Sequence, residues 1–320
     1  MRVVTFDAPG GPDALRIAER GMPDVGATDV LIRVVAAGVN RADVLQRQGR
    51  YPPPPGAPEW PGLEVAGEVA ALGEGAARWR IGDKVCALTP GGGYAEYVAV
   101  DRRLVLPVPP DVSVGDAAGL VEAACTVWSN LAAAGAQTGS SLLVHGGMSG
   151  IGSFAIQCAA ARGMRVYATA GTDARVSRCV ELGAVNAFNH RTQDWSGEVG
   201  REGGVDIVLD IMGAAYLDRN VASLAPGGTV VVIGLQGGTR GEVDLGALLT
   251  KRARIMGTTL RSRSLEERAS IVAAVRSEVW PLVPHEVRPI IAARYLFAHA
   301  ARAHAALEAG GVEGKILLEP

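Results

Sequence analysis

The residues whose types and spacing could do chemistry begin with four glycines in the segment LLVHGGMSGIG, residues 142–152. An apolar run typical of a buried parallel strand precedes them, and an alanine-rich helical pattern follows. Glycines let the backbone approach a ligand closely, and the N–H groups of a first helical turn attract anions. The segment therefore predicts a pyrophosphate site. We expect it to be lined by Gly146, Gly147, Met148, Ser149, Gly150, Ile151 and Gly152.

This motif alone has a simpler interpretation. Its spacing, Gly147-x-x-Gly150-x-Gly152, departs from the G-x-G-x-x-G pattern, and a glycine cluster can also be a plain turn. Its position between a strand and a helix favours the binding site, because parallel sheets bind ligands at the carboxyl ends of their strands.

The end of the next predicted strand, residues 165–170, indicates which dinucleotide would bind. Enzymes that use NAD place an acidic residue there, about 20 residues beyond the glycines, to bind the ribose 2′-hydroxyl. Here the strand is followed by Gly171, and Thr172 and Arg175 are suited to a 2′-phosphate. This pattern favours NADPH. Asp173 is the opposing feature, because its charge would repel a phosphate.

Composition limits the classes of function. The 320 residues are 48% hydrophobic and include 42 glycines, enough for two domains with many tight turns. The net charge of −2 gives no reason to expect a nucleic-acid partner. No apolar run reaches the roughly 20 residues of a membrane span, and the start MRVVTFDAPGG has no signal-peptide layout. The four cysteines are scattered and suggest no disulfide framework, so we expect a cytoplasmic protein. Because no membrane span is found, we expect no membrane contact.

The elements that must position these residues fall into two predicted domains. Residues 1–118 are predicted as short strands with glycine turns, which is typical of a barrel-like β domain. Residues 119–284 alternate apolar strands with helices, which predicts a doubly wound parallel sheet and an α/β fold class. Residues 285–320 are predicted to return to the β domain. Within these domains we expect one long helix over 114–136 and another over 264–279.

Several segments together resemble the zinc-free quinone oxidoreductases of the medium-chain dehydrogenase/reductase superfamily, of the zeta-crystallin or tumour-suppressor-inducible type. The resemblance runs from end to end. It implies a partly open, GroES-like β-barrel catalytic domain, a Rossmann domain, NADPH, and homodimers formed through the Rossmann sheets. The matching segments are GVNRADVLQRQGRYPPPPG, PGLEVAGEV, GGGYAEYV, LLVHGGMSGIG, ELGA, GTTLRSR and GKILLE.

The resemblance also bears on metal chemistry. Zinc alcohol dehydrogenases of the superfamily place a cysteine where Asn40 stands and a histidine where Leu63 stands, beside a glutamate that corresponds to Glu64. Asn40 and Leu63 supply neither thiolate nor imidazole, so we expect no metal site.

The candidate catalytic residues implied by the resemblance are Asn40 and Tyr51. Asn40 is expected to position the nicotinamide ribose or the acceptor, and its structural alternative is a helix N-cap, with Asp43 at the third position. Tyr51 is expected to cap the acceptor and donate to its oxygen. Its alternative is a stacking residue that anchors the proline loop.

Further cofactor contacts are implied only by the resemblance. His190 is expected near the adenosine phosphate, with an exposed loop histidine as its alternative. The remaining residues are expected near the nicotinamide and its carboxamide: Gly234, Leu235, Leu260 and Arg261.

These observations predict an NADPH-dependent reductase of small quinones, in which hydride transfer needs no metal because a quinone draws charge into its own oxygens. An enone or enoyl-thioester reductase uses the same geometry and stays open as an alternative. A second alternative is a low-turnover NADPH-binding sensor or RNA-binding protein, against which the near-neutral charge argues mildly.

Overall fold

The computed structural model describes all residues, Met1–Pro320, as two compact units. The first unit comprises Met1–Cys125, Arg261–His285 and Pro289–Pro320, and the second comprises Thr126–Leu260 with Glu286–Arg288. No helix is long and apolar enough to cross a membrane.

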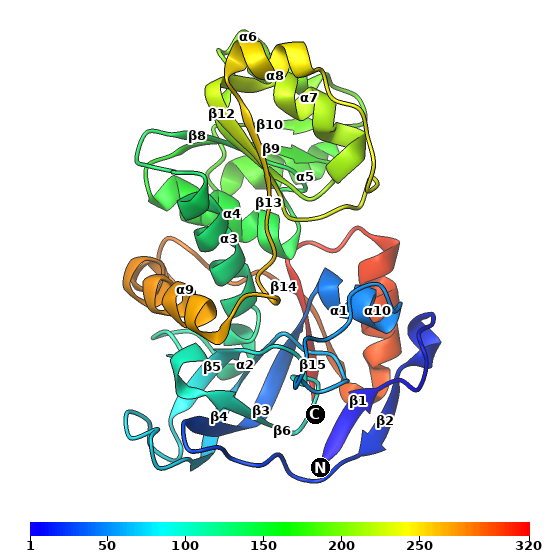
Figure 1. The fold of residues 1–320 in the computed structure, drawn as a ribbon, viewed down its shortest axis with the longest axis vertical. Helices are drawn as coiled ribbons and strands as arrows, with labels where there is room; N and C mark the ends of the chain where they lie inside the picture. Colours follow the sequence, from blue (N-terminus) through cyan, green and yellow to red (C-terminus); the bar gives the residue numbers. More distant parts are fainter. The chain divides into compact units, whose positions relative to one another are not determined.

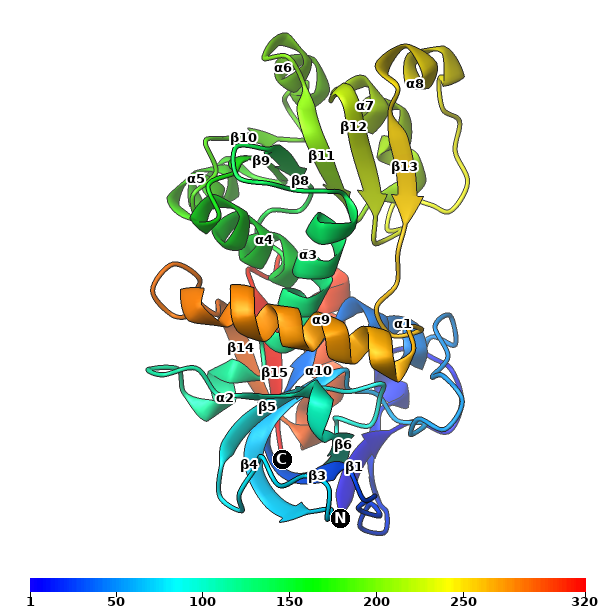
Figure 2. The ribbon, with the colours of Figure 1, turned by 60° about the vertical axis from the view of Figure 1, so that its left-hand side comes forward.

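The second unit is a Rossmann domain built on a six-stranded parallel sheet. Its strands follow the order β10-β9-β8-β11-β12-β13, as Figure 2 shows from left to right. This is the doubly wound 3-2-1-4-5-6 order, which reverses between the first and fourth strands and places the ligand crevice there. The strands are β8 (Ser141–Val144), β9 (Arg165–Ala170), β10 (Asn186–Asn189), β11 (Val205–Asp210), β12 (Leu224–Val232) and β13 (Arg254–Gly257).

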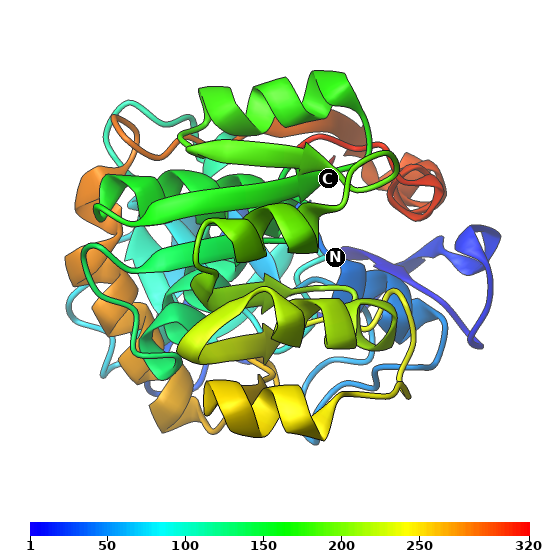
Figure 3. The ribbon, with the colours of Figure 1, turned by 90° about the horizontal axis from the view of Figure 1, so that it is seen from above.

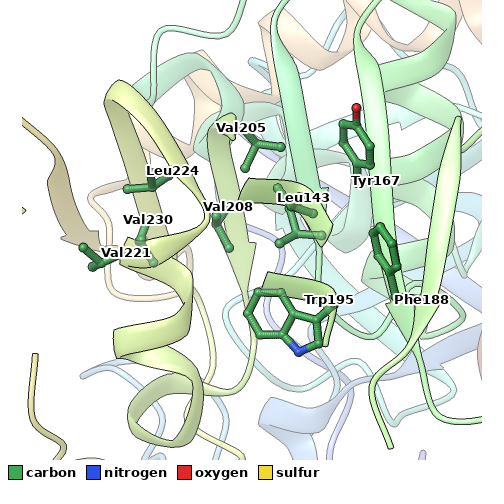
Figure 4. Packing of buried hydrophobic residues seen from close by; sticks show 10 residues of the cluster. Leu143, Tyr167, Phe188, Trp195, Val205, Val208, Val221, Leu224 and Val230 are labelled. Atoms are coloured by element: carbon green, nitrogen blue, oxygen red, sulfur yellow. The ribbon is translucent and has the colours of Figure 1, made fainter. Parts of the chain in front are cut away.

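Helices connect these strands, and α8, the yellow helix of Figure 3, lies at one edge of the unit in that view. The helices are α4 (Gly150–Ala161), α5 (Asp173–Glu181), α6 (Trp195–Arg201), η3 (Gly213–Tyr216), α7 (Leu217–Ala222) and α8 (Leu245–Lys251). A core cluster fills the space between helices and sheet (Figure 4). Trp195 is fully buried in this cluster, with its ring centre 4.7 Å from that of His145, and a buried aromatic ring of this size contributes strongly to core stability.

The first unit is β-rich and discontinuous in sequence. Its main sheet has the order β14-β15-β3-β4-β5-β7, with β6 paired to β3, and β1 and β2 form a separate ribbon (Figure 1). Its strands are β1 (Arg2–Thr5), β2 (Arg16–Glu19), β3 (Asp29–Val39), β4 (Glu64–Leu72), β5 (Lys84–Leu88), β6 (Tyr97–Asp101), β7 (Val105–Pro107), β14 (Ile291–Leu296) and β15 (Lys315–Glu319).

Short helices complete the first unit: η1 (Pro12–Ala14), α1 (Arg41–Arg47), η2 (Arg102–Leu104), α2 (Val114–Ala117), α9 (Leu265–Glu278), η4 (Trp280–Leu282), η5 (Phe297–His299) and α10 (Ala300–Ala309). Helix α3 (Val121–Ala133) begins in the first unit and ends in the second. The predicted fold class, a Rossmann sheet with a GroES-like β domain, is confirmed.

Two sequence expectations differ from the structure. The single helix expected over 114–136 is two helices, α2 and α3, and the second ends at Ala133. Helix α9 was expected with the Rossmann domain, yet it belongs to the first unit. The reason is packing against residues distant in sequence: α9 lies against η2 and β7, and Trp280 Nε1 after it donates to Pro107 O at 2.7 Å.

Candidate functional site

Three glycine-bearing turns meet at the carboxyl ends of β8, β11 and β12. A Cβ added to Gly146 would lie 2.6 Å from Ile211 Cδ1, and one added to Gly234 would lie 2.8 Å from Ile211 O. Leu235 covers the same turn, since a Cβ on Gly213 would lie 2.8 Å from its Cδ2. The structure therefore brings the ends of these three strands together around Ile211.

The turn after β8 has the shape that the glycines predicted. Gly146 has a φ of +66°, and a Cβ on Gly152 would overlap the Gly146 carbonyl oxygen, so helix α4 starts directly against the turn. Ser149 is the N-cap of α4, and its Oγ accepts from Gly152 N at 3.0 Å. A hydroxyl that accepts here can still donate its own proton to a ligand.

The other predicted residues of this turn differ in exposure. Met148 is buried, with 3% of its surface exposed, so its side chain is part of the core and only its backbone faces the turn. Gly150 and Ile151 start α4, where N–H groups lack partners within the helix. Gly147 is buried, and its N donates to Thr169 O at 2.8 Å, which ties the turn to β9.

The carboxyl end of β9 collects the residues predicted for a 2′-phosphate. Thr172 is the N-cap of α5, and its Oγ1 accepts from Arg175 N at 3.4 Å. Strand β10 pairs with β9 in parallel, with Asn189 opposite Ala170, so His190 stands beside Gly171. A Cβ at Gly171 would lie 3.3 Å from His190 Nε2. Burial first, and then the charge of Arg191, lower the pKa of His190, so its ring is neutral near pH 7.

Asn40 and two buried ionic side chains form a polar cluster in the first unit. Lys315 Nζ lies 2.5 Å from Glu64 Oε1 and 2.5 Å from Asn40 Oδ1. Asn40 Nδ2 donates to Glu64 Oε1 at 3.0 Å, and Glu64 Oε2 accepts from Glu122 N at 3.0 Å. The ammonium therefore fixes which end of the Asn40 amide is the acceptor.

The local backbone holds Asn40 at the N-cap position of α1, as its structural alternative anticipated. Asp43 Oδ2 accepts from Asn40 N at 2.8 Å, and Asp43 Oδ1 accepts from Gly62 N at 2.9 Å. Burial raises the pKa of Asp43 to about 6, while its hydrogen bonds and the charges of Lys315 and Arg261 act in the opposite direction. The Asp43 carboxylate therefore accepts a hydrogen bond from Asn40 and is also stabilised by the charge of Arg261.

Tyr51 and Arg261 form a second cluster in the first unit. The Arg261 guanidinium carbon lies 5.4 Å from the centre of the Tyr51 ring, and Arg261 Nη1 donates to Tyr51 O at 3.3 Å. Arg261 Nε donates to Pro90 O at 2.6 Å. Arg261 is only 6% exposed and anchors the proline loop from inside the unit, and its expected contact with the cofactor stays a prediction. Leu260, one residue earlier, is the half-buried last residue of its segment in the second unit.

Three functional candidates were not singled out from the sequence. Lys315 and Glu64 are 251 residues apart, and only the pairing of β15 with β3 and of β3 with β4 brings them together. Arg191 lies two residues after β10. Only the register of β10 against β9 places it beside Gly171, so this register would have been needed to identify it. No group of three or more His, Cys, Asp and Glu side chains is placed to hold a metal ion.

Comparison with known proteins assigns the family. Residues 26–110 match the model of the alcohol dehydrogenase GroES-like domain, and residues 150–275 match that of zinc-binding dehydrogenases. The quinone oxidoreductase of Lama guanicoe is 32% identical over 99% of this chain and 97% of its own. The human quinone oxidoreductase is also 32% identical, over 99% and 97% of the two chains.

Solved structures agree. The Escherichia coli quinone oxidoreductase, solved in complex with NADPH, superposes with a TM-score of 0.87 at 26% identity and covers 100% of both chains. The Pseudomonas syringae quinone oxidoreductase has a TM-score of 0.89 at 27% identity, over 100% of this chain and 99% of its own. The chain therefore belongs to the quinone oxidoreductase family of the medium-chain dehydrogenase/reductase superfamily, and it is an oxidoreductase.

Proposed function

We propose that this protein catalyses the NADPH-dependent reduction of small quinones without zinc. The observation that carries the proposal is the cluster of Asn40, Glu64 and Lys315. In the zinc enzymes of the superfamily a cysteine stands in place of Asn40. Here the ammonium of Lys315 supplies the positive charge beside Glu64, and Asn40 and Leu63 provide no thiolate or imidazole.

The second unit fits a dinucleotide phosphate. The turn packs so closely that side chains at Gly146, Gly147 and Gly152 would meet backbone or core atoms, which supports close approach of a pyrophosphate. The first turn of α4 and Ser149 would bind the pyrophosphate. Thr172, Arg175 and His190 would bind the adenosine end, and Gly234 and Leu235 would border the nicotinamide.

When bound, NADPH supplies a hydride. The chain's own residues then have two tasks: to hold the acceptor and to donate to its oxygen as charge develops there. Burial raises the pKa of Tyr51, so its hydroxyl stays protonated near pH 7 and can donate a hydrogen bond to a quinone oxygen. Lys315 holds the Asn40 amide in one orientation. Preorganised groups of this kind avoid a reorganisation cost during reaction.

We also propose a homodimer formed through the Rossmann sheet. Strand β13 is the last strand of the sheet order and pairs only with β12, so its other edge is unpaired. Exposed apolar side chains lie on this strand and on α8. Ile255 of β13 is 39% exposed, and Leu245 and Leu249 of α8 are 64% and 77% exposed. An unpaired edge with exposed apolar residues is suited to a second copy of the chain.

A substrate comparison tests the proposed activity. Purified protein is assayed for NADPH oxidation with 1,2-naphthoquinone and with a crotonyl thioester, and for NADP⁺ reduction with a simple alcohol. We expect turnover with the quinone to exceed the other two. Faster turnover with the thioester would replace the proposal by an enoyl-thioester reductase, and turnover with the alcohol alone would contradict it.

A further inference from the structure

The end of β9 faces two nitrogen-bearing side chains where an NAD enzyme has a carboxylate. A Cβ at Gly171 would lie 3.3 Å from His190 Nε2, 3.6 Å from Arg191 Nε and 3.8 Å from Arg191 Cζ. The strand register explains this, since Asn189 opposite Ala170 sends the two residues after β10 alongside Gly171. Any group that binds at this strand end therefore meets a guanidinium.

Charge separates the roles of these two side chains. The pKa of His190 is lowered by burial and by the neighbouring Arg191, so the histidine is a neutral hydrogen-bonding group near pH 7. Arg191 is exposed, and its side chain ends in a guanidinium, a planar fork of N–H donors. A phosphate dianion gains most from a charged fork of N–H donors, which Arg191 offers and His190 does not.

Asn189 connects this guanidinium with the acidic residue that opposes it. Asn189 Oδ1 accepts from Arg191 N at 3.1 Å, while Asn189 Nδ2 donates to Asp173 Oδ1 at 2.6 Å. Asn189 N in turn donates to Gln193 Oε1 at 2.6 Å, and the residue is only 6% exposed. The side-chain amide of Asn189 thus binds the backbone N–H of Arg191 with its oxygen and the Asp173 carboxylate with its nitrogen. It holds that carboxylate against the end of β10.

From this geometry we propose that Arg191 is a direct ligand of the ribose 2′-phosphate, and that Asn189 is the positioning residue that sets the preference for NADPH over NADH. Held by Asn189, the Asp173 carboxylate is kept from turning to the ribose, where it would accept from a 2′-hydroxyl and repel a 2′-phosphate. The proposal rests on the NADPH part of the proposed function.

Nucleotide fragments test the direct contact without any acceptor. Binding of 2′,5′-ADP and of 5′-AMP, which differ by the 2′-phosphate, is measured by calorimetry for the wild type, Arg191→Ala and Arg178→Ala. Arg178 is an exposed arginine on α5 paired with Glu181, so its variant is a control of equal charge change. We expect Arg191→Ala to weaken 2′,5′-ADP about tenfold and 5′-AMP less than about twofold. Equal losses for both fragments, or no loss, would overturn the contact.

The role of Asn189 is tested through the carboxylate that it holds. Asn189→Ala should lower the ratio of kcat/KM for NADPH to that for NADH at least about fivefold, and adding Asp173→Asn should restore most of that ratio. A merely structural asparagine would alter both cofactors alike, and the second substitution would rescue neither. Thermal unfolding of each variant checks that it is folded.

These results separate the inference from the proposed function. If the wild type binds 2′,5′-ADP more tightly than 5′-AMP and Arg191→Ala removes the difference, the inference stands even when no quinone is reduced. If quinones are reduced equally with NADH and NADPH, and the two fragments bind equally, the inference fails while quinone reduction remains.

Discussion

Lys315 and Glu64 form a buried ion pair in the first unit, with Lys315 Nζ 2.5 Å from Glu64 Oε1 and side-chain exposures of 6% and 0%. Their strands are joined only through β3, since β15 pairs with one side of β3 and β4 with the other. The pair orients Asn40, because the Lys315 ammonium that binds Glu64 also donates to Asn40 Oδ1.

Removal of one partner leaves a buried charge without compensation. We therefore expect Lys315→Met to lower the free energy of unfolding by about 3–5 kcal/mol, measured by urea denaturation. Lys84→Met, at an exposed lysine of β5, is the control and should change it by less than about 0.5 kcal/mol.

The double variant Glu64→Gln with Lys315→Met removes both charges. It should regain roughly half of the lost stability, because the buried carboxylate is gone. Equal stability of Lys315→Met and the wild type would show that the pair does not carry the energy assigned to it.

The hydroxyl of Tyr51 is assigned as a donor to the acceptor oxygen. Tyr51→Phe keeps the ring over Arg261 and removes only that donor, so kcat with a quinone should fall roughly tenfold to a hundredfold while KM for NADPH changes little. Tyr97→Phe, on β6, is the matched control. Steady-state kinetics at saturating NADPH make the comparison. An unchanged kcat in Tyr51→Phe would leave the tyrosine only its anchoring role.

His145 makes stability depend on pH in the second unit. Its ring nitrogens lie 2.9 Å from Thr169 Oγ1 and 2.7 Å from Asn220 Oδ1, and burial lowers its pKa to about 4. Since the unfolded histidine titrates near 6.5, this contribution is fully present above that pH and is lost as the pH falls toward about 4. Between about pH 7.5 and about pH 5 it amounts to about 2 kcal/mol.

Urea denaturation at these two pH values measures the effect. His145→Gln should be less stable at pH about 7.5 but should lose about 2 kcal/mol less than the wild type on acidification. The exposed His285→Gln should follow the wild type. If His145→Gln lost as much of its free energy of unfolding on acidification as the wild type does, other groups would cause the acid sensitivity.

The proposed homodimer makes a prediction at the sheet edge. Leu249→Lys together with Ile255→Lys places charges among the exposed apolar residues beside β13 and should convert a dimer to a monomer in light scattering. Val180→Lys, at a residue of α5 that is 47% exposed, should stay dimeric. A monomeric wild type at micromolar concentration would refute the dimer directly.

Local patterns in the sequence determined much of the architecture. Apolar strands alternating with helices predicted the parallel sheet, and the glycines of residues 146–152 predicted the turn after β8, because both depend on short-range periodicity and backbone freedom. The helix after Asn40 and its Asp43 cap were likewise local.

Features that depend on long-range packing were not predictable in this way. Helix α9 follows a Rossmann strand in sequence, yet its apolar face, Ile271, Val272 and Val275, is buried within the first unit. Arg261 follows the same strand, but its guanidinium binds the carbonyls of Tyr51 and Pro90. In both cases a partner 171 to 210 residues away decides the position, and no local signal encodes it.

The most direct test of the central claim is the rate of NADPH oxidation with 1,2-naphthoquinone, measured before and after exhaustive dialysis against a chelator, with metal analysis of the same sample. We expect an unchanged rate and less than about one-tenth of a zinc ion per chain, because Lys315 supplies the positive charge beside Glu64 and Asn40 supplies no thiolate. A rate that disappears on dialysis and returns with added zinc would contradict it.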